Sequence, residues 1–183
     1  MKVGAERIRH IVASLRTFSR KDEAEKKSVD IHQGLDSTLM ILAHRLKAQQ
    51  NRPKIEIAKS YGNLPPVYCY AGQLNQVFMN ILSNGIDAVA NVKAPQIKLT
   101  THLQDEQVVI AFADNGMGKT EQVRSQIFKP YFTTKPIGKG TGMGLSISYQ
   151  IVTERHGGSL STTSTPGQGT TFTIKIPLSQ PEK

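Results

Sequence analysis

The chain has 183 residues, of which 38% are hydrophobic and 20% charged, and its formal net charge is +9 at pH 7. This composition is typical of a globular domain with its own core and excludes a largely disordered chain. The basic balance fits nucleic acid, an acidic membrane surface or a phosphate-bearing ligand, and equally a solvated surface alone. The sequence has no arginine-rich run. Because it has only six Phe, five Tyr and no Trp, it also offers no dense aromatic array for stacking bases.

The single cysteine, Cys69, excludes an internal disulfide and favours a reducing compartment. No window reaches the roughly 18 apolar residues of a membrane span, and the first ten residues contain no apolar signal core. We therefore expect a cytoplasmic domain with no membrane segment in this chain, whether or not a parent protein is anchored in a membrane elsewhere.

The N-terminal half predicts helices that alternate with short strands. Residues 4–20 place apolar residues at spacings of three and four and predict an amphipathic helix, and the charged residues 21–27 predict a connector. Residues 28–46 predict a short strand that leads into a helix, and residues 54–62 alternate as a strand does. A long helix is expected over residues 71–92, with a buried face formed by Leu74, Val77, Phe78, Ile81, Leu82, Ile86 and Val89.

The C-terminal half predicts two hairpins that flank a helix. Residues 96–103 and 107–114 alternate and predict paired strands, and residues 144–158 predict a helix that ends at Gly157 and Gly158. Residues 159–165 and 170–178 predict a hairpin around a Pro-Gly-Gln-Gly turn. The pattern predicts an α+β fold: a two-layer sandwich whose mixed, mostly antiparallel sheet is covered by helices on one face.

Three polar clusters are candidates for a functional site. Asn80, Asn84 and Asp87 lie on one helix face, either as oxygen ligands for Mg²⁺ or as a polar shoulder of the helix. Asp114 ends a strand and opens the sequence DNGMG, either as an acceptor for the exocyclic amine of a base or as an ordinary turn. Four alternate glycines over residues 138–144 precede a helix and can cradle phosphates, or form a mobile loop.

Taken in this order, the motifs resemble the ATP-binding catalytic domain of bacterial two-component sensor histidine kinases. That domain belongs to an ATP-binding superfamily (the Bergerat-type fold) shared with the gyrase B subunit, MutL-type proteins and a heat-shock chaperone. The resemblance covers about residues 28–178. NQVFMNILSNGIDAV resembles the N box, DNGMG the first glycine box, IFKPYFTTK the F box and GKGTGMGL the second glycine box. GQGTTFTIKIP is similar to the closing glycine-threonine motif.

The resemblance implies ATP and Mg²⁺ as cofactors, with Asn84 as the metal ligand and Asp114 as the residue that reads adenine. Asn80 and Lys135 are the implied catalytic residues, and the segment around Lys135 is implied to be a mobile lid over the nucleotide. The implied nucleotide-binding residues are Asn80, Asn84, Asp87, Asp114, Gly116, Gly118, Phe128, Thr133, Thr134, Lys135, Gly138, Gly140, Gly142, Met143, Gly144, Leu145 and Thr170.

The resemblance also implies partners. Residues 1–20 are similar to the end of the second helix of the dimerisation and phosphoacceptor hairpin, with 21–27 as the linker, 28–178 as the catalytic domain and 179–183 as a tail. None of the five histidines, His10 included, precedes an acidic residue, so we expect the acceptor histidine to lie outside this sequence and the chain alone not to phosphorylate itself. The implied partners are the hairpin and the receiver domain of a response regulator, in a homodimeric parent that binds no nucleic acid.

Two positions depart from the family pattern: Gly85 stands where alanine is usual, and Met143 where leucine is common. Three other functions compete with the histidine kinase. A conformational ATPase has a glutamate at the position of Asn80 to activate water, which asparagine cannot do. A serine kinase of the anti-sigma type is not expected to carry the helix over residues 4–20. A nucleic-acid binder is not favoured, because the sequence contains no base-reading motif.

Overall fold

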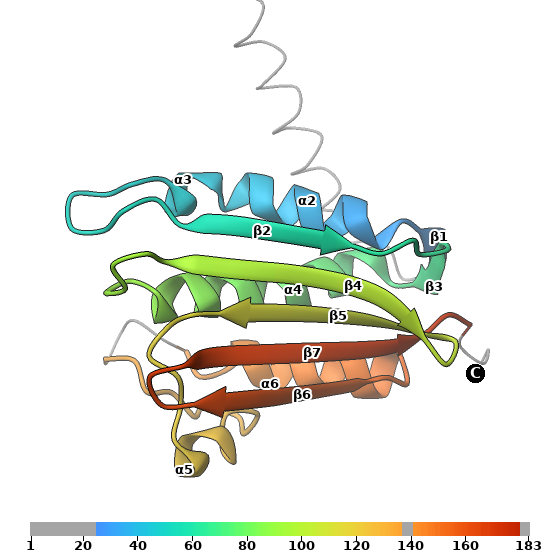
Figure 1. The fold of residues 1–183 in the computed structure, drawn as a ribbon. Helices are drawn as coiled ribbons and strands as arrows, with labels where there is room; N and C mark the ends of the chain where they lie inside the picture. The colour runs from blue at the N-terminus through green and yellow to red at the C-terminus, as the bar shows by residue number, and fades with distance from the viewer. Residues whose placement is uncertain (1–24, 137–140, 180–183) are drawn as a thin grey trace, which may run out of the picture.

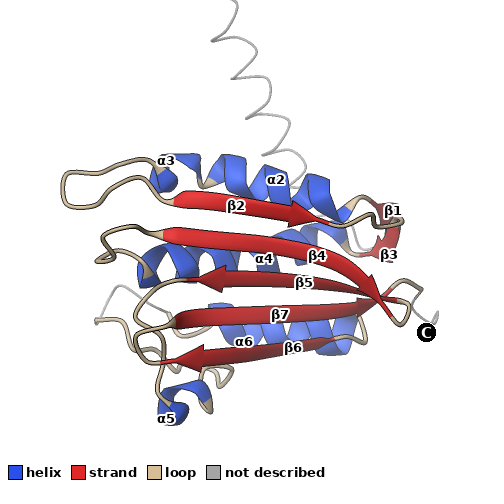
Figure 2. Cartoon of the chain, viewed as in Figure 1, coloured by secondary structure: helices blue, strands red, loops and turns tan. Residues whose placement is uncertain are grey.

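A computed structural model describes residues 25–136 and 141–179. The predicted helix over residues 4–20, His10, Gly138 and Gly140 lie outside these residues. The described chain forms two layers, a sheet and a set of helices on one of its faces (Figures 1 and 2). Within the described residues, no helix combines the length and the apolar character that crossing a membrane requires.

The main sheet has five strands in the order β2-β4-β5-β7-β6. Strand β2 runs parallel to β4, and the other three pairings are antiparallel. A separate antiparallel pair joins β1 to β3. The strands are β1 (Lys27–Val29), β2 (Glu56–Tyr61), β3 (Val67–Cys69), β4 (Gln96–Gln104), β5 (Gln107–Asp114), β6 (Ser159–Thr165) and β7 (Gly169–Pro177). The predicted α+β sandwich with a mixed, mostly antiparallel sheet is confirmed.

Helices α4 and α6 cover the face of the sheet that points away from the viewer in Figure 1, and α2 lies along the β2 edge. The helical segments are α2 (Ile31–Ile41), α3 (Ala43–Leu46), α4 (Ala71–Ala88), α5 (Glu121–Arg124) and α6 (Gly144–Gln150). A π-helical turn, η1 (Ile151–Arg155), continues α6.

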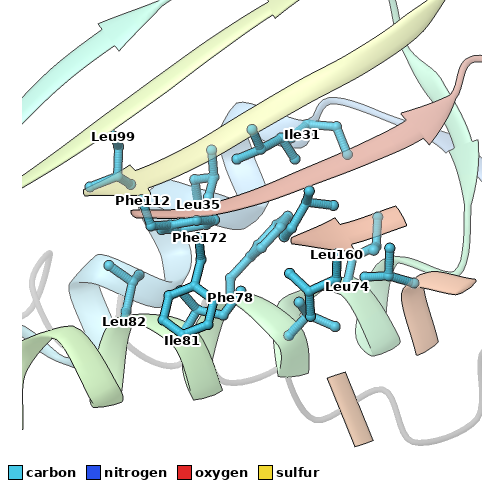
Figure 3. Close-up of a cluster of buried hydrophobic side chains, with 14 of the residues drawn as sticks. Ile31, Leu35, Leu74, Phe78, Ile81, Leu82, Leu99, Phe112, Leu160 and Phe172 are labelled. Carbon is cyan, nitrogen blue, oxygen red and sulfur yellow. The ribbon is translucent and has the colours of Figure 1, made fainter. Parts of the chain in front are cut away.

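The core lies between α4 and the sheet. Phe78 on α4 packs against Phe112 on β5 with 5.9 Å between ring centroids, and both side chains are almost completely buried. The apolar face of α4 supplies most of the helical side of this cluster, as Figure 3 shows for Leu74, Ile81 and Leu82. With one face of α4 committed to the core, Asn80 lies on the side of the helix that faces α6.

The structure corrects three predicted helices. The helix expected over residues 71–92 ends at Ala88. The helix expected within 28–46 is divided at Leu42, which is the C-cap of α2 and the N-cap of α3. The helix expected over 144–158 changes to the π-helical turn after Gln150 and ends at Arg155, with His156 as the C-cap and Gly157, whose φ is 60°, directly after it.

Candidate functional site

A cavity of about 570 Å³ lies between α4, the segment 127–136 and the start of α6. Asn80, Asn84 and Asp87 all line it, so the predicted polar face of α4 is the wall of a cavity. The remaining lining residues are Ser83, Ala88, Met117, Lys119, Val123, Ile127, Phe132, Thr133, Thr134, Lys135, Pro136, Thr141, Gly142, Gly144, Leu145 and Phe172. An apolar cavity wall with a few converging polar groups is the usual form of a small-molecule site.

Lys135 meets two oxygens of α4 at the cavity rim. Its Nζ donates to Asp87 Oδ2 at 2.6 Å and to Asn84 Oδ1 at 3.2 Å. The second carboxylate oxygen of Asp87 accepts a hydrogen bond from Arg45 Nη2 at 2.5 Å. Asp87 therefore lies between two cations, one from α3 and one from the segment before the glycine loop.

Asn80 faces the start of α6. Its Nδ2 donates to the carbonyl oxygen of Gly144 at 3.0 Å and to Ser148 Oγ at 3.1 Å. The amide nitrogen is thus engaged in holding α6 against α4, and a side-chain amide has no basic nitrogen with which to take a proton.

Asp114 ends β5 and is half-buried beside the C-terminal end of α4. Its Oδ1 accepts the backbone N–H of Gly116 at 2.9 Å. Burial raises the pKa of Asp114, while the Gly116 N–H, the charge of Lys119 and the backbone N–H of Thr170 each lower it. Asp114 does not line the cavity itself, but a Cβ at Gly116 would lie 2.5 Å from the carbonyl oxygen of Ala88, a lining residue. The Asp114–Gly116 turn therefore packs directly behind the cavity wall.

Gly118 and Thr170, both implied by the resemblance to bind the nucleotide, do not line the cavity. Gly118 has a φ of +67°, and a Cβ there would lie 2.0 Å from the carbonyl oxygen of Thr165, so only glycine fits against the β6–β7 turn. Thr170 is buried, and its hydroxyl pairs with Ser164 Oγ at 2.9 Å. Since Ser164 Oγ also accepts the backbone N–H of Lys119 at 2.8 Å, both residues help to hold the turn after β5 against β6 and β7.

The segment that resembles the F box reaches the cavity at Thr133, Thr134 and Lys135. Phe128 lies outside the lining, with its ring 5.2 Å from that of Tyr149 and 6.5 Å from that of Phe172. Phe128 therefore packs this segment against α6 and the sheet.

Gly142, in the described part of the glycine loop, packs against Tyr131. This residue has a φ of +66°, and a Cβ there would lie 2.5 Å from the backbone of Tyr131. The next residue, Met143, is the N-cap of α6, and Leu145 in its first turn lines the cavity. Glycine at 142 thus lets the chain before α6 pass close to the backbone of Tyr131.

Two cationic residues of the site were not predicted from the sequence. Lys119 lines the cavity and is partly buried. Burial lowers the pKa of its ammonium, the charge of Asp114 raises it, and the charge of Lys135 lowers it further. Arg45 reaches Asp87 from 42 positions earlier in the chain. Only the position of Lys119 directly after DNGMG could have drawn notice, because nothing in the sequence connects Arg45 to the N box.

Comparison with known proteins decides the family. Residues 70–180 match the model of the histidine kinase-, DNA gyrase B- and HSP90-like ATPases. The chain belongs to this family.

Two curated relatives that resemble this chain are kinases. Sporulation kinase E of Bacillus subtilis (strain 168) is 36% identical over 136 residues, which cover 74% of this chain and 18% of that kinase. Sensor kinase CckA of Brucella abortus (strain 2308) is 35% identical and aligns with 100% of this chain and 20% of its own length. The chain thus spans about a fifth of the length of these relatives.

Solved structures of the family agree with the fold. The catalytic domain of histidine kinase ThkA matches with a TM-score of 0.73 and 25% identity, covering 85% of this chain and 99% of that domain. Full-length ShkA in complex with AMPPNP covers 97% of this chain and 36% of its own, with a TM-score of 0.73 and 24% identity. ThkA in complex with response regulator protein TrrA covers 97% of this chain and 49% of its own, with a TM-score of 0.71 and 22% identity. At these last two identities the likeness concerns the fold alone.

The oxygen pair on α4 has the chemistry to bind a divalent cation. No group of three or more His, Cys, Asp or Glu residues among the described residues could hold a metal by itself. Asn84 and Asp87 nevertheless each present a hard oxygen to the same ammonium group. Mg²⁺ takes few protein ligands and completes its octahedron with phosphates and water, so this small donor set suits it.

Proposed function

We propose that this domain binds MgATP in the cavity and transfers the γ-phosphoryl group to a histidine on a dimerisation hairpin. The observation that carries the proposal is the convergence of an oxygen pair, Asn84 and Asp87, with two lysines, Lys119 and Lys135, in one cavity. Oxygens suit the metal and ammonium groups suit the phosphates, so the lining matches both parts of a metal-bound triphosphate. The match to the catalytic domain of histidine kinase ThkA favours histidine as the acceptor.

The base end of the nucleotide is assigned to the turn after β5. Asp114, which lies behind the lining residue Ala88, accepts the exocyclic amine of adenine, and Gly116 lets this turn pack against Ala88 more closely than a residue with a side chain could. Gly118 and Thr170 act by positioning the turn. This direction places the phosphates toward Lys135 and the N-terminal end of α6.

The phosphate end is assigned to Thr133, Thr134, Lys135 and the glycines of the second glycine box, described at Gly142 and Gly144. Asn84 would hold Mg²⁺, whose charge neutralises the phosphate oxygens. In the reaction the bond from the γ-phosphorus to its bridging oxygen breaks, a bond to an imidazole nitrogen forms, and ADP leaves. The chain contributes positioning and charge compensation, which is what phosphoryl transfer chiefly requires.

The wider setting follows from the same proposal. A homodimeric parent, with this domain in the cytoplasm, would supply the hairpin, and a response regulator would take the phosphoryl group from the histidine. Among proteins of this fold, ThkA forms a complex with response regulator protein TrrA. We propose no nucleic-acid partner.

A conformational ATPase is the competing function within the family. Such an enzyme needs a base that activates water beside the γ-phosphate. Asn80 occupies the corresponding place on α4, donates its amide hydrogens to α6 and cannot accept a proton from water. Slow hydrolysis is therefore expected, which favours transfer to another group.

The test combines binding with transfer. Calorimetry is expected to show ATP binding that is strengthened by Mg²⁺, and Asn84→Ala is expected to weaken binding of MgATP much more than binding of adenosine. With γ-labelled ATP, the chain alone is expected to stay unlabelled, whereas an added hairpin fragment gains an acid-labile, base-stable phosphoryl group. Rapid ATP turnover by the chain alone, or label on His10, would contradict the proposal.

A further inference from the structure

Lys135 occupies the place on α4 where a metal ion would need oxygen ligands. Its ammonium nitrogen lies 3.2 Å from Asn84 Oδ1 and 2.6 Å from Asp87 Oδ2. Asn84 and Asp87 are one turn apart on α4, so their oxygens reach the same point from neighbouring positions of one helix face. The geometry is that of a cation held by two oxygens.

A second cation and this ammonium cannot share the position. Mg²⁺ binds oxygen at about 2.0–2.1 Å, and at that distance from Asn84 Oδ1 it would lie within a few ångströms of the Lys135 nitrogen, where two positive charges repel strongly. We propose that Lys135 and the divalent cation compete for the Asn84–Asp87 oxygens, so that the metal enters only as Lys135 leaves. This inference rests on the proposed function, because it takes Asn84 as the metal ligand.

Arg45 keeps Asp87 in place during the exchange. It donates to Oδ1 of Asp87, whereas Lys135 donates to Oδ2, so the arginine contact does not depend on the lysine. When Lys135 leaves, Asp87 remains hydrogen-bonded and its charge remains compensated. The oxygen pair therefore does not need to rearrange when one cation replaces the other.

Once released, the Lys135 ammonium group can bind nucleotide phosphates in the same cavity. Lys135 belongs to the lining that also includes Lys119, Thr133 and Thr134. An anionic triphosphate between Lys119 and Lys135 relieves the repulsion between the two ammonium groups, which contributes to the lowered pKa of Lys119. The cation that arrives with the nucleotide thus frees the lysine that the phosphates attract.

The experiment measures metal binding without nucleotide. Mn²⁺ prefers the same oxygen ligands as Mg²⁺, and its paramagnetic broadening of the Asn84 side-chain amide signals reports occupancy of this position in the isotope-labelled chain. Lys135→Met is expected to bind Mn²⁺ about threefold more tightly than the unaltered chain, a size set by the usual strength of a partly exposed ion pair. Lys135→Gln is expected to change the affinity in the same direction.

Lys59→Met is the matched control. Lys59 also pairs with an aspartate, Asp36, at 2.7 Å, is comparably exposed and carries the same charge, but it lies on β2 outside the cavity lining. Its removal is expected to leave the Mn²⁺ affinity unchanged, since the effect requires the lysine at the oxygen pair and not a change in net charge.

The outcomes separate the two proposals. If the unaltered chain binds ATP but neither variant of Lys135 binds Mn²⁺ more tightly, the competition is wrong and the proposed function stands. An equal gain in Lys59→Met would also overturn the competition. If the unaltered chain binds neither ATP nor Mn²⁺, the proposed function itself fails.

Discussion

Asn80 on α4 is hydrogen-bonded to Gly144, the first residue of α6, through its side-chain amide and the Gly144 carbonyl oxygen, 3.0 Å apart. The same nitrogen reaches Ser148 Oγ one turn further along. Asn80 thus connects the polar face of α4 to the point where the glycine loop becomes a helix. A residue assigned to the site by its motif is, in this structure, also a contact between two helices.

Replacing Asn80 by alanine is therefore expected to destabilise the fold as well as nucleotide binding. The loss of both hydrogen bonds is expected to lower the free energy of unfolding by about 1–2 kcal/mol, measured by urea denaturation without nucleotide. Gln76→Ala, at an exposed position of the same helix, is the control and is expected to have a small effect. Equal stability of Asn80→Ala and the unaltered chain would show that the contact with α6 contributes nothing.

Gly85, in the interior of α4, is expected to tolerate and even favour alanine. A Cβ there would lie 3.4 Å from Ile97 Cδ1 and 3.9 Å from Asp114 Cβ, which are ordinary contact distances. Because glycine is about 1 kcal/mol less favourable than alanine within a helix, Gly85→Ala is expected to raise the free energy of unfolding by about 0.5–1 kcal/mol.

Thermal and urea denaturation would check this gain, with Gly34→Ala in α2 as the comparison. At Gly34 a Cβ would lie 2.5 Å from Asn75 Oδ1, a buried side chain, so the clash is expected to remove the benefit. A loss of stability in Gly85→Ala would indicate that the packing of α4 against Ile97 and Asp114 requires glycine at this position.

His156 is expected to make the fold sensitive to mild acid. Its ring is buried, Nδ1–H donates to the Ile151 carbonyl at 2.8 Å, and Nε2 accepts the backbone N–H of Tyr70 at 3.1 Å. Burial lowers the pKa of His156, although its bond to Ile151 raises it and the charge of Lys26 lowers it further.

The unfolded chain therefore takes up a proton on this histidine at a higher pH than the folded chain does. Stability is present above about pH 6.5, the ordinary pKa of histidine, and is lost as the pH falls from there through the lower folded pKa. Urea midpoints between pH 8 and pH 5 are expected to fall less steeply in His156→Gln than in the unaltered chain. His102→Gln, on the exposed side of β4, is the control, and parallel curves for all three chains would contradict the role of His156.

Local patterns predicted the fold well, because each element carries its own signal. Alternation in residues 96–103 and 107–114 is enough to place β4 and β5, and the spacing of Asn80, Asn84 and Asp87 is enough to place them on one face of α4. The predicted lengths of the helices were wrong where the apolar pattern continues beyond the helix. Val89 still packs into the core after α4 has ended.

The charged contacts of the site could not be predicted, because they join residues far apart in the chain. Lys135 reaches Asp87 across 48 positions and Arg45 reaches it across 42. The short helix α5 also escaped notice, since four residues are too few to show a helical period. Sequence motifs indicated which residues gather at the cavity, whereas their pairing depends on how α3, α4 and the segment 131–135 pack.

Asp114 is expected to favour ATP over GTP at the expense of stability. If its carboxylate accepts the amine of adenine, guanine would place a carbonyl oxygen against it, and two acceptors repel. Asp114→Asn is therefore expected to weaken ATP binding by about 1–3 kcal/mol and to reduce the preference for ATP, both measured by calorimetry. Unchanged affinity together with unchanged preference would contradict the role in reading the base.

The same substitution is expected to stabilise the nucleotide-free fold at neutral pH. Burial raises the pKa of Asp114 above its ordinary value, so above that folded pKa the ionised carboxylate destabilises the folded chain relative to the unfolded one. The destabilisation disappears as the pH falls through the raised pKa, because the folded chain then takes up the proton more readily. Asp114→Asn keeps an acceptor for the Gly116 N–H without the charge, so its advantage in free energy of unfolding is expected to be largest near pH 7 and to shrink toward pH 4. Glu56→Gln, at an exposed position on β2, is the control. If the gain in free energy of unfolding of Asp114→Asn grew as the pH fell, the folded chain would be stabilising the ionised carboxylate, and the prediction would be wrong.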